Sequence, residues 1–249
     1  MFDIDLYYKT LLEQAKRLGI LKQILGYAEA YPIYYFNPLF YSKNTFLIAT
    51  GFHGDEQSGP LGVLAFLMDT KSNQDMNCSI LPMVNPTGFI NNTRESRLGG
   101  NPNRGYVKSE IERTKNDPIS IEGMILRNNL NLFLDASKLG CISLHEDPDM
   151  EDFYMYSTMS NDGRNKTICD ALKQEVVDFG CKITNKKMIL GDKVEDGIIY
   201  NVFDGSFEHL LVNHNVPLVI TVEVPTKYET LEARTVLSKK LIERFMAVV

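Results

Sequence analysis

The residues with the clearest chemical potential are His53 and Glu56, which lie three positions apart directly after the apolar run of residues 46–49. On an extended strand, positions i and i+3 point to opposite faces, so these side chains converge only if the chain turns into a helix. Gly51 and Gly54 permit such a turn. Imidazole nitrogen and carboxylate oxygen are suitable zinc ligands, and a catalytic zinc uses three protein ligands. Unless both are ordinary loop residues, the pair predicts a metal site that needs a third ligand.

His145 is the best candidate for that third ligand. It follows the short apolar run of residues 141–144, which is typical of a buried strand, so it stands at the carboxyl end of that strand. In α/β proteins, substrates and cofactors bind beyond the carboxyl ends of the parallel strands. His53 is expected at the same edge of the sheet. His209 falls in a predicted helix and His214 in the turn after it. For these two histidines we expect a surface or capping role.

Glu223 is a carboxylate inside the apolar, β-branched run of residues 218–224. Charged groups are rarely buried without a partner, so this side chain must meet a cation, a metal-bound water or a proton. A buried ion pair with a lysine or an arginine is the structural alternative. Beside a zinc-bound water, Glu223 would act as a general base.

Two arginines and an Asn-Arg pair stand out in the long polar stretch of residues 85–118. A loop of this length inside a compact domain is usually functional. Arginine presents a planar fork that binds carboxylates, and it also stabilises an oxyanion that develops near a metal. Unless they are only solvated loop residues, Arg94, Arg97 and the pair Asn103-Arg104 indicate a substrate that carries a carboxylate and is cleaved at a carbonyl.

Helices and strands alternate along the chain in a pattern that predicts one α/β domain covering residues 1–249. The predicted helices cover residues 6–18, 59–68, 119–139, 167–179, 205–213 and 228–248, and the predicted strands cover 26–36, 46–49, 78–84, 141–144, 153–158, 187–190 and 218–224. Pro32 argues for an edge position of the first strand. Polar residues follow or close three of the strands, which brings His53, His145 and Glu223 to one edge of the sheet.

The composition excludes several other classes of protein. The formal net charge is -6, from 26 basic and 32 acidic residues, and the basic residues are scattered, so neither nucleic acid nor a membrane surface is an expected partner. No apolar run approaches the length of a membrane span, and the first residues lack a signal-peptide pattern, which predicts a cytoplasmic protein. The four cysteines are widely spaced without a C-x-x-C motif, so we expect buried thiols.

In their order, these motifs resemble the signature of the zinc carboxypeptidase family, which includes the aspartoacylase and succinylglutamate desuccinylase relatives. The matching positions are His53 and Glu56, the Asn-Pro-Thr-Gly segment of residues 85–88, Arg94, Asn103-Arg104, His145, Tyr200, the Gly-Ser segment of residues 205–206, and Glu223. The resemblance covers about residues 26–225. It implies a three-layer α/β fold with a central mixed, mostly parallel sheet flanked by helices.

The resemblance also implies a role for each matching residue. One Zn²⁺ would be held by His53, Glu56 and His145, and Glu223 would activate the attacking water. Arg94 would polarise the scissile carbonyl, with Arg97 as its competitor for that role. Asn103 and Arg104 would grip the terminal carboxylate of the substrate, Tyr200 would close over the substrate, and Phe207 would lie in the pocket for the last side chain.

The sequence departs from the family pattern at two places. The family usually has an Asp two residues before its Asn-Arg pair, which orients the first zinc histidine, and this chain has Asn101 there. An amide oxygen accepts the same imidazole N–H but brings no charge, so we expect weaker zinc binding or a less basic ligand. The second departure is an acidic run after His145, at residues 146–152. We expect a solvated loop, with an amine-bearing substrate as the alternative.

The leading functional hypothesis is a zinc-dependent hydrolase that cleaves an amide bond next to a free carboxylate in a small peptide, as a carboxypeptidase does. The alternative is a zinc deacylase of small N-acyl amino acids, like the aspartoacylase and desuccinylase relatives. The His-Gly-Asp-Glu form of the first motif and the short chain favour the deacylase, whereas the segment from Tyr200 to Phe207 and the Asn-Pro-Thr-Gly element favour the peptidase. A catalytically silent binding module is a third reading.

Overall fold

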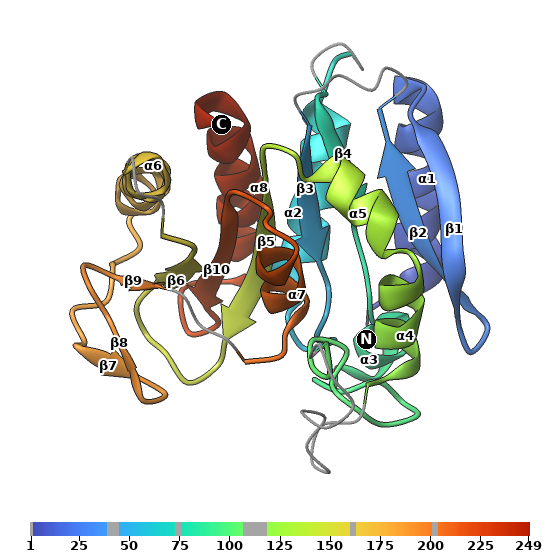
Figure 1. The fold of residues 1–249 in the computed structure, drawn as a ribbon. Helices are drawn as coiled ribbons and strands as arrows, with labels where there is room; N and C mark the ends of the chain where they lie inside the picture. Colours follow the sequence, from blue (N-terminus) through green and yellow to red (C-terminus); the bar gives the residue numbers. More distant parts are fainter. Residues whose placement is uncertain (1, 39–44, 73–75, 107–118, 160–162, 201–203) are drawn as a thin grey trace.

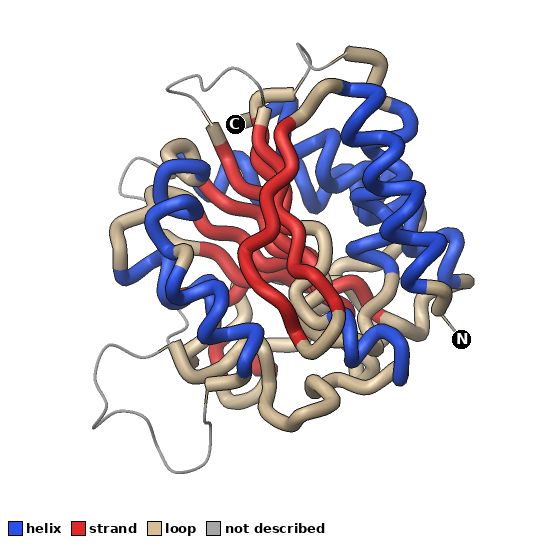
Figure 2. The backbone as a smooth tube through the Cα atoms, turned by 90° about the vertical axis from the view of Figure 1, so that its right-hand side faces the viewer, coloured by secondary structure: helices blue, strands red, loops and turns tan. Residues whose placement is uncertain are grey.

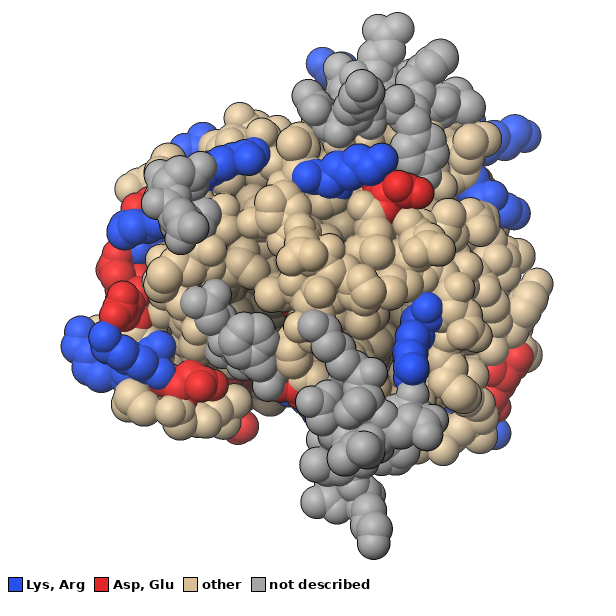
Figure 3. Space-filling view, in the orientation of Figure 1, with Lys and Arg blue, Asp and Glu red and all other residues tan. Residues whose placement is uncertain are grey.

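The computed structural model describes residues 2–38, 45–72, 76–106, 119–159, 163–200 and 204–249. A central sheet runs through the molecule, and helices lie on both of its faces (Figures 1 and 2). No helix in these ranges is long and apolar enough to cross a membrane. On the face drawn in Figure 3, basic side chains lie scattered among acidic ones, mostly around the edge of the view.

The central sheet contains eight strands in the order β1-β2-β4-β3-β5-β10-β6-β9. These are β1 (Leu21–Ala28), β2 (Tyr31–Asn37), β3 (Phe46–Thr50), β4 (Cys78–Leu81), β5 (Gly140–Asp147), β6 (Tyr154–Ser157), β9 (Ile198–Tyr200) and β10 (Val219–Pro225). The four middle strands, β4, β3, β5 and β10, run parallel, whereas β2 and β6 run antiparallel to them. A separate hairpin pairs β7 (Met188–Ile189) with β8 (Asp192–Lys193).

Two apolar layers join the sheet to its helices. The helices are α1 (Ile4–Leu18), α2 (Ser58–Asp69), α3 (Pro86–Asn91), α4 (Ile121–Asn128), α5 (Leu130–Ala136), α6 (Arg164–Asp178), α7 (Phe207–Asn213) and α8 (Leu231–Val248). α1, α2, α6 and α8 pack on one face, and α4, α5 and α7 pack on the other. The three-layer α/β fold with a mixed, mostly parallel sheet is therefore confirmed.

Residues alternate along β5, and this alternation decides which side chains reach the site. Cys141 packs in the layer of α5 and α7, whereas Ile142 packs in the layer of α2 and α8. His145 shares the face of Cys141, and Glu146 shares the face of Ile142, because successive side chains on a strand point to opposite faces. Adjacent residues thus serve opposite layers of the molecule.

Glu146 is a buried structural residue and does not belong to a solvated loop, contrary to the sequence-based expectation. Its carboxylate accepts the backbone N–H of Ser58 at the start of α2 (2.8 Å) and pairs with the guanidinium of Arg234 on α8 (2.6 Å). A carboxylate at a helix N-terminus satisfies backbone donors that the helix leaves unpaired. Glu146 therefore ties the carboxyl end of β5 to two helices behind the sheet.

The other differences from the predicted elements have local causes. Residues 26–36 are not one strand, because the chain turns at Glu29 (φ 55°) between β1 and β2. Pro32 does not mark an edge strand: β2 pairs with β1 along its length and with β4 at Phe36, beyond the proline. The helix expected over residues 119–139 breaks at Asn129, whose amide donates to the carbonyl of Ile125 (2.9 Å). Part of the stretch 85–118 lies outside the described residues.

The loop after β3 meets helix α3 at a backbone contact that only glycine allows. A Cβ built on Gly54 would lie 1.9 Å from the carbonyl carbon of Gly88 and 2.3 Å from its oxygen. The N–H of Gly54 donates to the carbonyl of Thr93 (3.0 Å), and the N–H of Thr93 donates to that of Gly88 (3.0 Å). The loop that follows β3 is therefore held against the segment that leads into Arg94.

Replacing Gly54 by alanine is expected to destabilise the protein by about 3 kcal/mol or more, because the new methyl group overlaps backbone atoms that cannot rotate away. Gly99→Ala is the control: it forces alanine to a φ of +90° but meets nothing within 4 Å, so it should cost only about 1 kcal/mol. Urea unfolding of both variants measures the difference. A Gly54→Ala variant no less stable than Gly99→Ala would contradict this account of the contact.

Candidate active site

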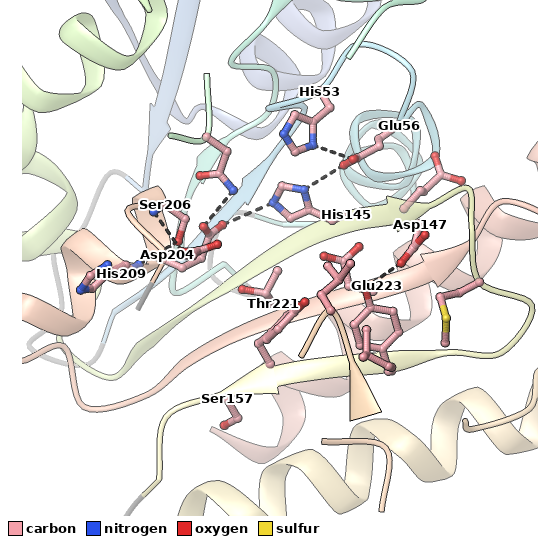
Figure 4. Close-up of a pocket in the computed structure, with 18 of the residues that line it drawn as sticks. His53, Glu56, His145, Asp147, Ser157, Asp204, Ser206, His209, Thr221 and Glu223 are labelled. Carbon is pink, nitrogen blue, oxygen red and sulfur yellow. Dashed lines mark hydrogen bonds and ion pairs between the residues drawn. The ribbon is translucent and has the colours of Figure 1, made fainter. Parts of the chain in front are cut away.

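Three buried side chains meet at the carboxyl ends of β3 and β5. The Nδ1 atom of His53 lies 2.6 Å from Oε1 of Glu56, and the Nδ1 atom of His145 lies 2.8 Å from Oε2 of the same carboxylate. His53 and Glu56 come from the turn between β3 and α2, and His145 comes from β5 (Figure 4). The chain does leave the strand after β3, and this turn lets positions i and i+3 converge.

The second ring nitrogen of each histidine is also held. Nε2 of His53 lies 3.0 Å from the amide oxygen of Asn101. Nε2 of His145 lies 3.1 Å from Oγ of Ser143 and 3.4 Å from Oε1 of Glu208. In the metal-free chain each Nδ1 atom donates to the Glu56 carboxylate. A metal ion would take the place of these two protons, and the contacts at Nε2 would then hold both rings with Nδ1 toward the metal, which is how metal-binding histidines are usually oriented.

The donor set fits a divalent metal such as zinc. One ligand atom from each of His53, Glu56 and His145 lies within 4.8 Å of the others, and all three residues are buried. Two imidazoles and one carboxylate are a common catalytic zinc set that leaves a position for water. In the metal-free chain, burial alone would raise the pKa of Glu56, but the charges and hydrogen bonds of the two histidines hold it well below its usual range. The carboxylate is therefore ionised and ready to bind a cation.

Glu223 lies beside this triad on the neighbouring strand. β10 pairs with β5 in parallel register, with Glu223 opposite His145, and both side chains line the same pocket (Figure 4). Burial raises the pKa of Glu223 to about 8, with a further rise from the nearby Glu56 carboxylate and an opposing effect of His145. No ion pair joins Glu223 to a lysine or arginine among the described residues, so the structural alternative has no support there.

The two arginines that compete for the carbonyl role lie in different places. Arg94 reaches into the pocket, and its Nη1 atom lies 3.0 Å from Oε1 of Glu56. Arg97 lies outside the pocket lining, is two-thirds exposed and pairs with Glu29 at 3.8 Å. The geometry therefore favours Arg94 over Arg97 as the guanidinium that meets a substrate.

Asn103 and Arg104 also line the pocket. Asn103 is buried, its amide N–H donates to Glu208 (3.0 Å), and its amide oxygen accepts the backbone N–H of Phe207 (2.9 Å). Arg104 is partly exposed and pairs with Asp204 at 3.1 Å. A substrate carboxylate would compete with Asp204 for this guanidinium. The pair is thus positioned to bind an anionic group.

Tyr200 and Phe207 do not line the pocket, contrary to expectation. Phe207 is fully buried and packs edge to face on Phe133 and against Phe52, whose ring stacks on His145. Its role is to support the site from behind. Tyr200 ends β9 and packs against the layer of α6. Burial there raises the pKa of Tyr200, Asp170 raises it further, and Lys166 lowers it.

Sequence reasoning missed several residues that the structure brings to the pocket. Glu208, Tyr154 and Tyr156 line it, together with the β7 residues Met188 and Ile189. Glu208 could have been found by the criterion that identified Glu223, because it is also a carboxylate among apolar residues. It lies in helix α7, which is largely buried. Burial alone would raise the pKa of Glu208, but His145 and Ser143 lower it to about 2.

The pocket is a cavity of about 500 Å³ with the metal triad at its wall. Its remaining wall is formed by β6, the segment after His145 and the β7-β8 hairpin, where Met150 and Ile189 pack with Tyr154 in a small apolar cluster. A cavity of this size holds a small molecule or the end of a peptide. The arrangement places three groups that could hold a metal, a buried carboxylate and guanidinium groups around one cavity.

Comparison with solved structures finds close neighbours over nearly the whole chain. A "putative metallopeptidase" from Shewanella denitrificans is 34% identical, with a TM-score of 0.84 over 98% of this chain and 90% of that chain. Another from Shewanella amazonensis is 31% identical, with a TM-score of 0.87 over 98% and 92%. A metallo-carboxypeptidase from Burkholderia cenocepacia shares the fold at 15% identity, with a TM-score of 0.67 over 99% and 69%. No protein-family model and no curated protein sequence matches the chain.

The purified protein is expected to bind about one zinc ion per chain, because the described part of the chain offers one set of three ligands. His145→Ala removes one ligand and should abolish binding. His214→Ala is the matched control, since this histidine is exposed in the turn after α7. Metal analysis after zinc addition and dialysis measures all three proteins. Zinc retained by the His145→Ala variant would mean that the metal is held elsewhere.

In the metal-free protein, Glu223 should make stability fall as pH rises. A carboxyl whose pKa is raised from 4.5 to about 8 by folding binds its proton more tightly in the folded state, so stability is lost across this window. The slope is at most about 1.4 kcal/mol per pH unit. Glu223→Gln removes the titration, and urea unfolding with chelator present at pH 5, 6.5 and 8 compares the proteins. A difference in stability that is constant with pH would contradict the raised pKa.

Proposed function

Because the chain belongs to a family of metallopeptidases and shares its fold with a metallo-carboxypeptidase, we propose that it is a zinc-dependent hydrolase of carboxypeptidase type. Its substrate would be a small peptide with a free terminal carboxylate, and the bond cleaved would be the amide next to that carboxylate.

The observation that carries the proposal is the convergence of three kinds of group on one cavity. The ligands His53, Glu56 and His145, the base Glu223, and the cationic or amide groups of Arg94, Asn103 and Arg104 all line it. Each group alone has a structural explanation. Together they provide the ligands for a metal, a base beside that site, and anion-binding groups within the reach of one small substrate.

A zinc ion held by the triad would supply Lewis-acid chemistry, which lowers the pKa of water and polarises a carbonyl. Asn103 and Arg104 bind the terminal carboxylate and so orient the scissile amide. Glu223 takes a proton from the attacking water and then passes it to the leaving amine. Arg94 turns from Glu56 to the carbonyl oxygen and stabilises the charge that develops there.

A deacylase of small N-acyl amino acids is the second candidate, and one observation favours it. The tyrosine expected to close over a peptide, Tyr200, packs on α6 instead, and the apolar residues Met150 and Ile189 stand in the cavity wall. A cavity of about 500 Å³ accommodates an acyl group and one amino acid. A deacylase would use the same metal, the same base and the same residues to bind the substrate carboxylate. Its substrate would differ from a peptide only in the group on the acyl side of the bond.

A substrate panel tests the function. Peptides with free C-termini should be hydrolysed, the same peptides with amidated C-termini should not, and N-acyl amino acids should react more slowly. Glu223→Gln should lower kcat by about 10²–10⁴ because general-base catalysis is lost. Faster turnover of N-acyl amino acids than of peptides would move the assignment to the deacylase.

Arg94 and Arg97 provide a matched pair of controls for the panel. Arg94→Ala should lower kcat by about 10²–10³, the usual effect of removing an oxyanion-stabilising group, whereas Arg97→Ala should change it less than about twofold. Hydrolysis of neither substrate class by zinc-loaded protein would leave the silent binding module as the explanation and would overturn both enzymatic assignments.

A further inference from the structure

Glu208 is a buried carboxylate at the site to which no role has yet been given. It occupies the second position of α7, is 7% exposed, lines the pocket, and contacts His145 at the ring nitrogen that faces away from Glu56. No lysine or arginine pairs with it among the described residues. A buried, ionised carboxylate is costly unless it receives several hydrogen bonds, so its partners explain its presence.

The partners of Glu208 belong to the site itself. Oε1 lies 3.4 Å from Nε2 of His145, and Oε2 accepts the side-chain N–H of Asn103 at 3.0 Å. Ser143 contacts both His145 and Glu208. Its hydroxyl oxygen is 3.1 Å from Nε2 of His145, and the hydroxyl also hydrogen-bonds to Glu208. Because a hydroxyl both accepts and donates, Ser143 relays the contact where the direct distance is long.

The two metal-ligand histidines therefore have different supports. Nε2 of His53 meets the neutral amide oxygen of Asn101 at 3.0 Å, whereas Nε2 of His145 meets a pair made of Ser143 and the Glu208 carboxylate. A carboxylate behind a ligating imidazole fixes its orientation and makes it a stronger donor to the metal. The only full charge behind the two rings, among the described residues, lies on the side of His145.

We propose that Glu208 is the positioning residue of this site: its carboxylate, acting directly and through Ser143, orients His145 and supplies the charge that Asn101 does not supply to His53. The same carboxylate holds Asn103, so one side chain fixes both a metal ligand and a group placed to bind the substrate carboxylate. This inference rests on the proposed metal-dependent function. It identifies a residue that would increase the affinity of the three ligands for the metal.

A merely structural role for Glu208 would have a different signature. Asn103 also accepts the backbone N–H of Phe207 through its own oxygen (2.9 Å), so the tie between α7 and the Asn103 segment does not depend on the carboxylate. Glutamine has the shape of glutamate and retains one oxygen acceptor but not the charge. Glu208→Gln should therefore preserve the packing and remove the electrostatic support.

The experiment measures the zinc dissociation constant of the full chain by competition with a chromophoric chelator. Glu208→Gln should weaken zinc binding by about 10–100-fold, the usual effect of losing an outer-shell carboxylate, while the unfolding temperature of the metal-free protein stays close to that of wild type. Glu122→Gln is the matched control: Glu122 is equally buried but has no contact with either histidine, so its zinc affinity should not change.

A second substitution tests whether the charge is what matters. Asn101→Asp places a carboxylate behind His53, and in the Glu208→Gln background it should recover most of the lost affinity. Failure of this rescue would overturn the claim that Glu208 supplies the missing charge. Should Glu208→Gln fail to fold, Ser143→Ala replaces it, because removing the relay hydroxyl should also weaken zinc binding.

The outcomes separate this inference from the proposed function. Wild-type protein that binds no zinc would contradict the proposed function itself. Wild-type protein that binds zinc, with unchanged affinity in Glu208→Gln, would overturn only the role of Glu208. A fall in the unfolding temperature of the metal-free variant without a change in zinc affinity would show that Glu208 is structural, and it would overturn the inference as well.

Discussion

The in-register parallel pairing of β5 with β10 is the constraint on which the site depends. It sets Glu223 beside His145, and the alternation of side chains directs both to the face covered by α7. A slip of one residue would turn one of them toward α2 and α8, because successive side chains on a strand point to opposite faces.

The proposed metal ligands and Glu223 could be located from the sequence because His53, His145 and Glu223 each follow or close a short, strongly apolar strand. Strand ends in a parallel sheet share one edge, so three strand predictions were enough to bring these residues together. Phe207, Tyr200 and Glu208 could not be placed in this way. Ser206 caps α7 through the N–H of His209, and that cap sets the rotation of the helix, which turns Phe207 to the core and Glu208 to the pocket.

The fold was predictable where periodicity was strong and less so where turns had unusual residues. The β1-β2 hairpin turns at Glu29 with a positive φ, and glutamate gives no turn signal of the kind that Gly or Asn gives. The break between α4 and α5 at Asn129 depends on a side-chain bond to the preceding turn, which competes with helix propagation. Neither feature can be deduced from the hydrophobic pattern.

The contact of Gly54 with Gly88 limits which half of the cavity can change in sequence. It joins the loop of the first two ligands to the segment that leads to Arg94 into one rigid unit, so few substitutions in that half of the cavity are compatible with the fold. The wall made by the β7-β8 hairpin has no such constraint and carries the exposed Leu190 at its tip. Variation of the hairpin would therefore change what the cavity binds, while the half that contains His53, Glu56 and Arg94 stays fixed.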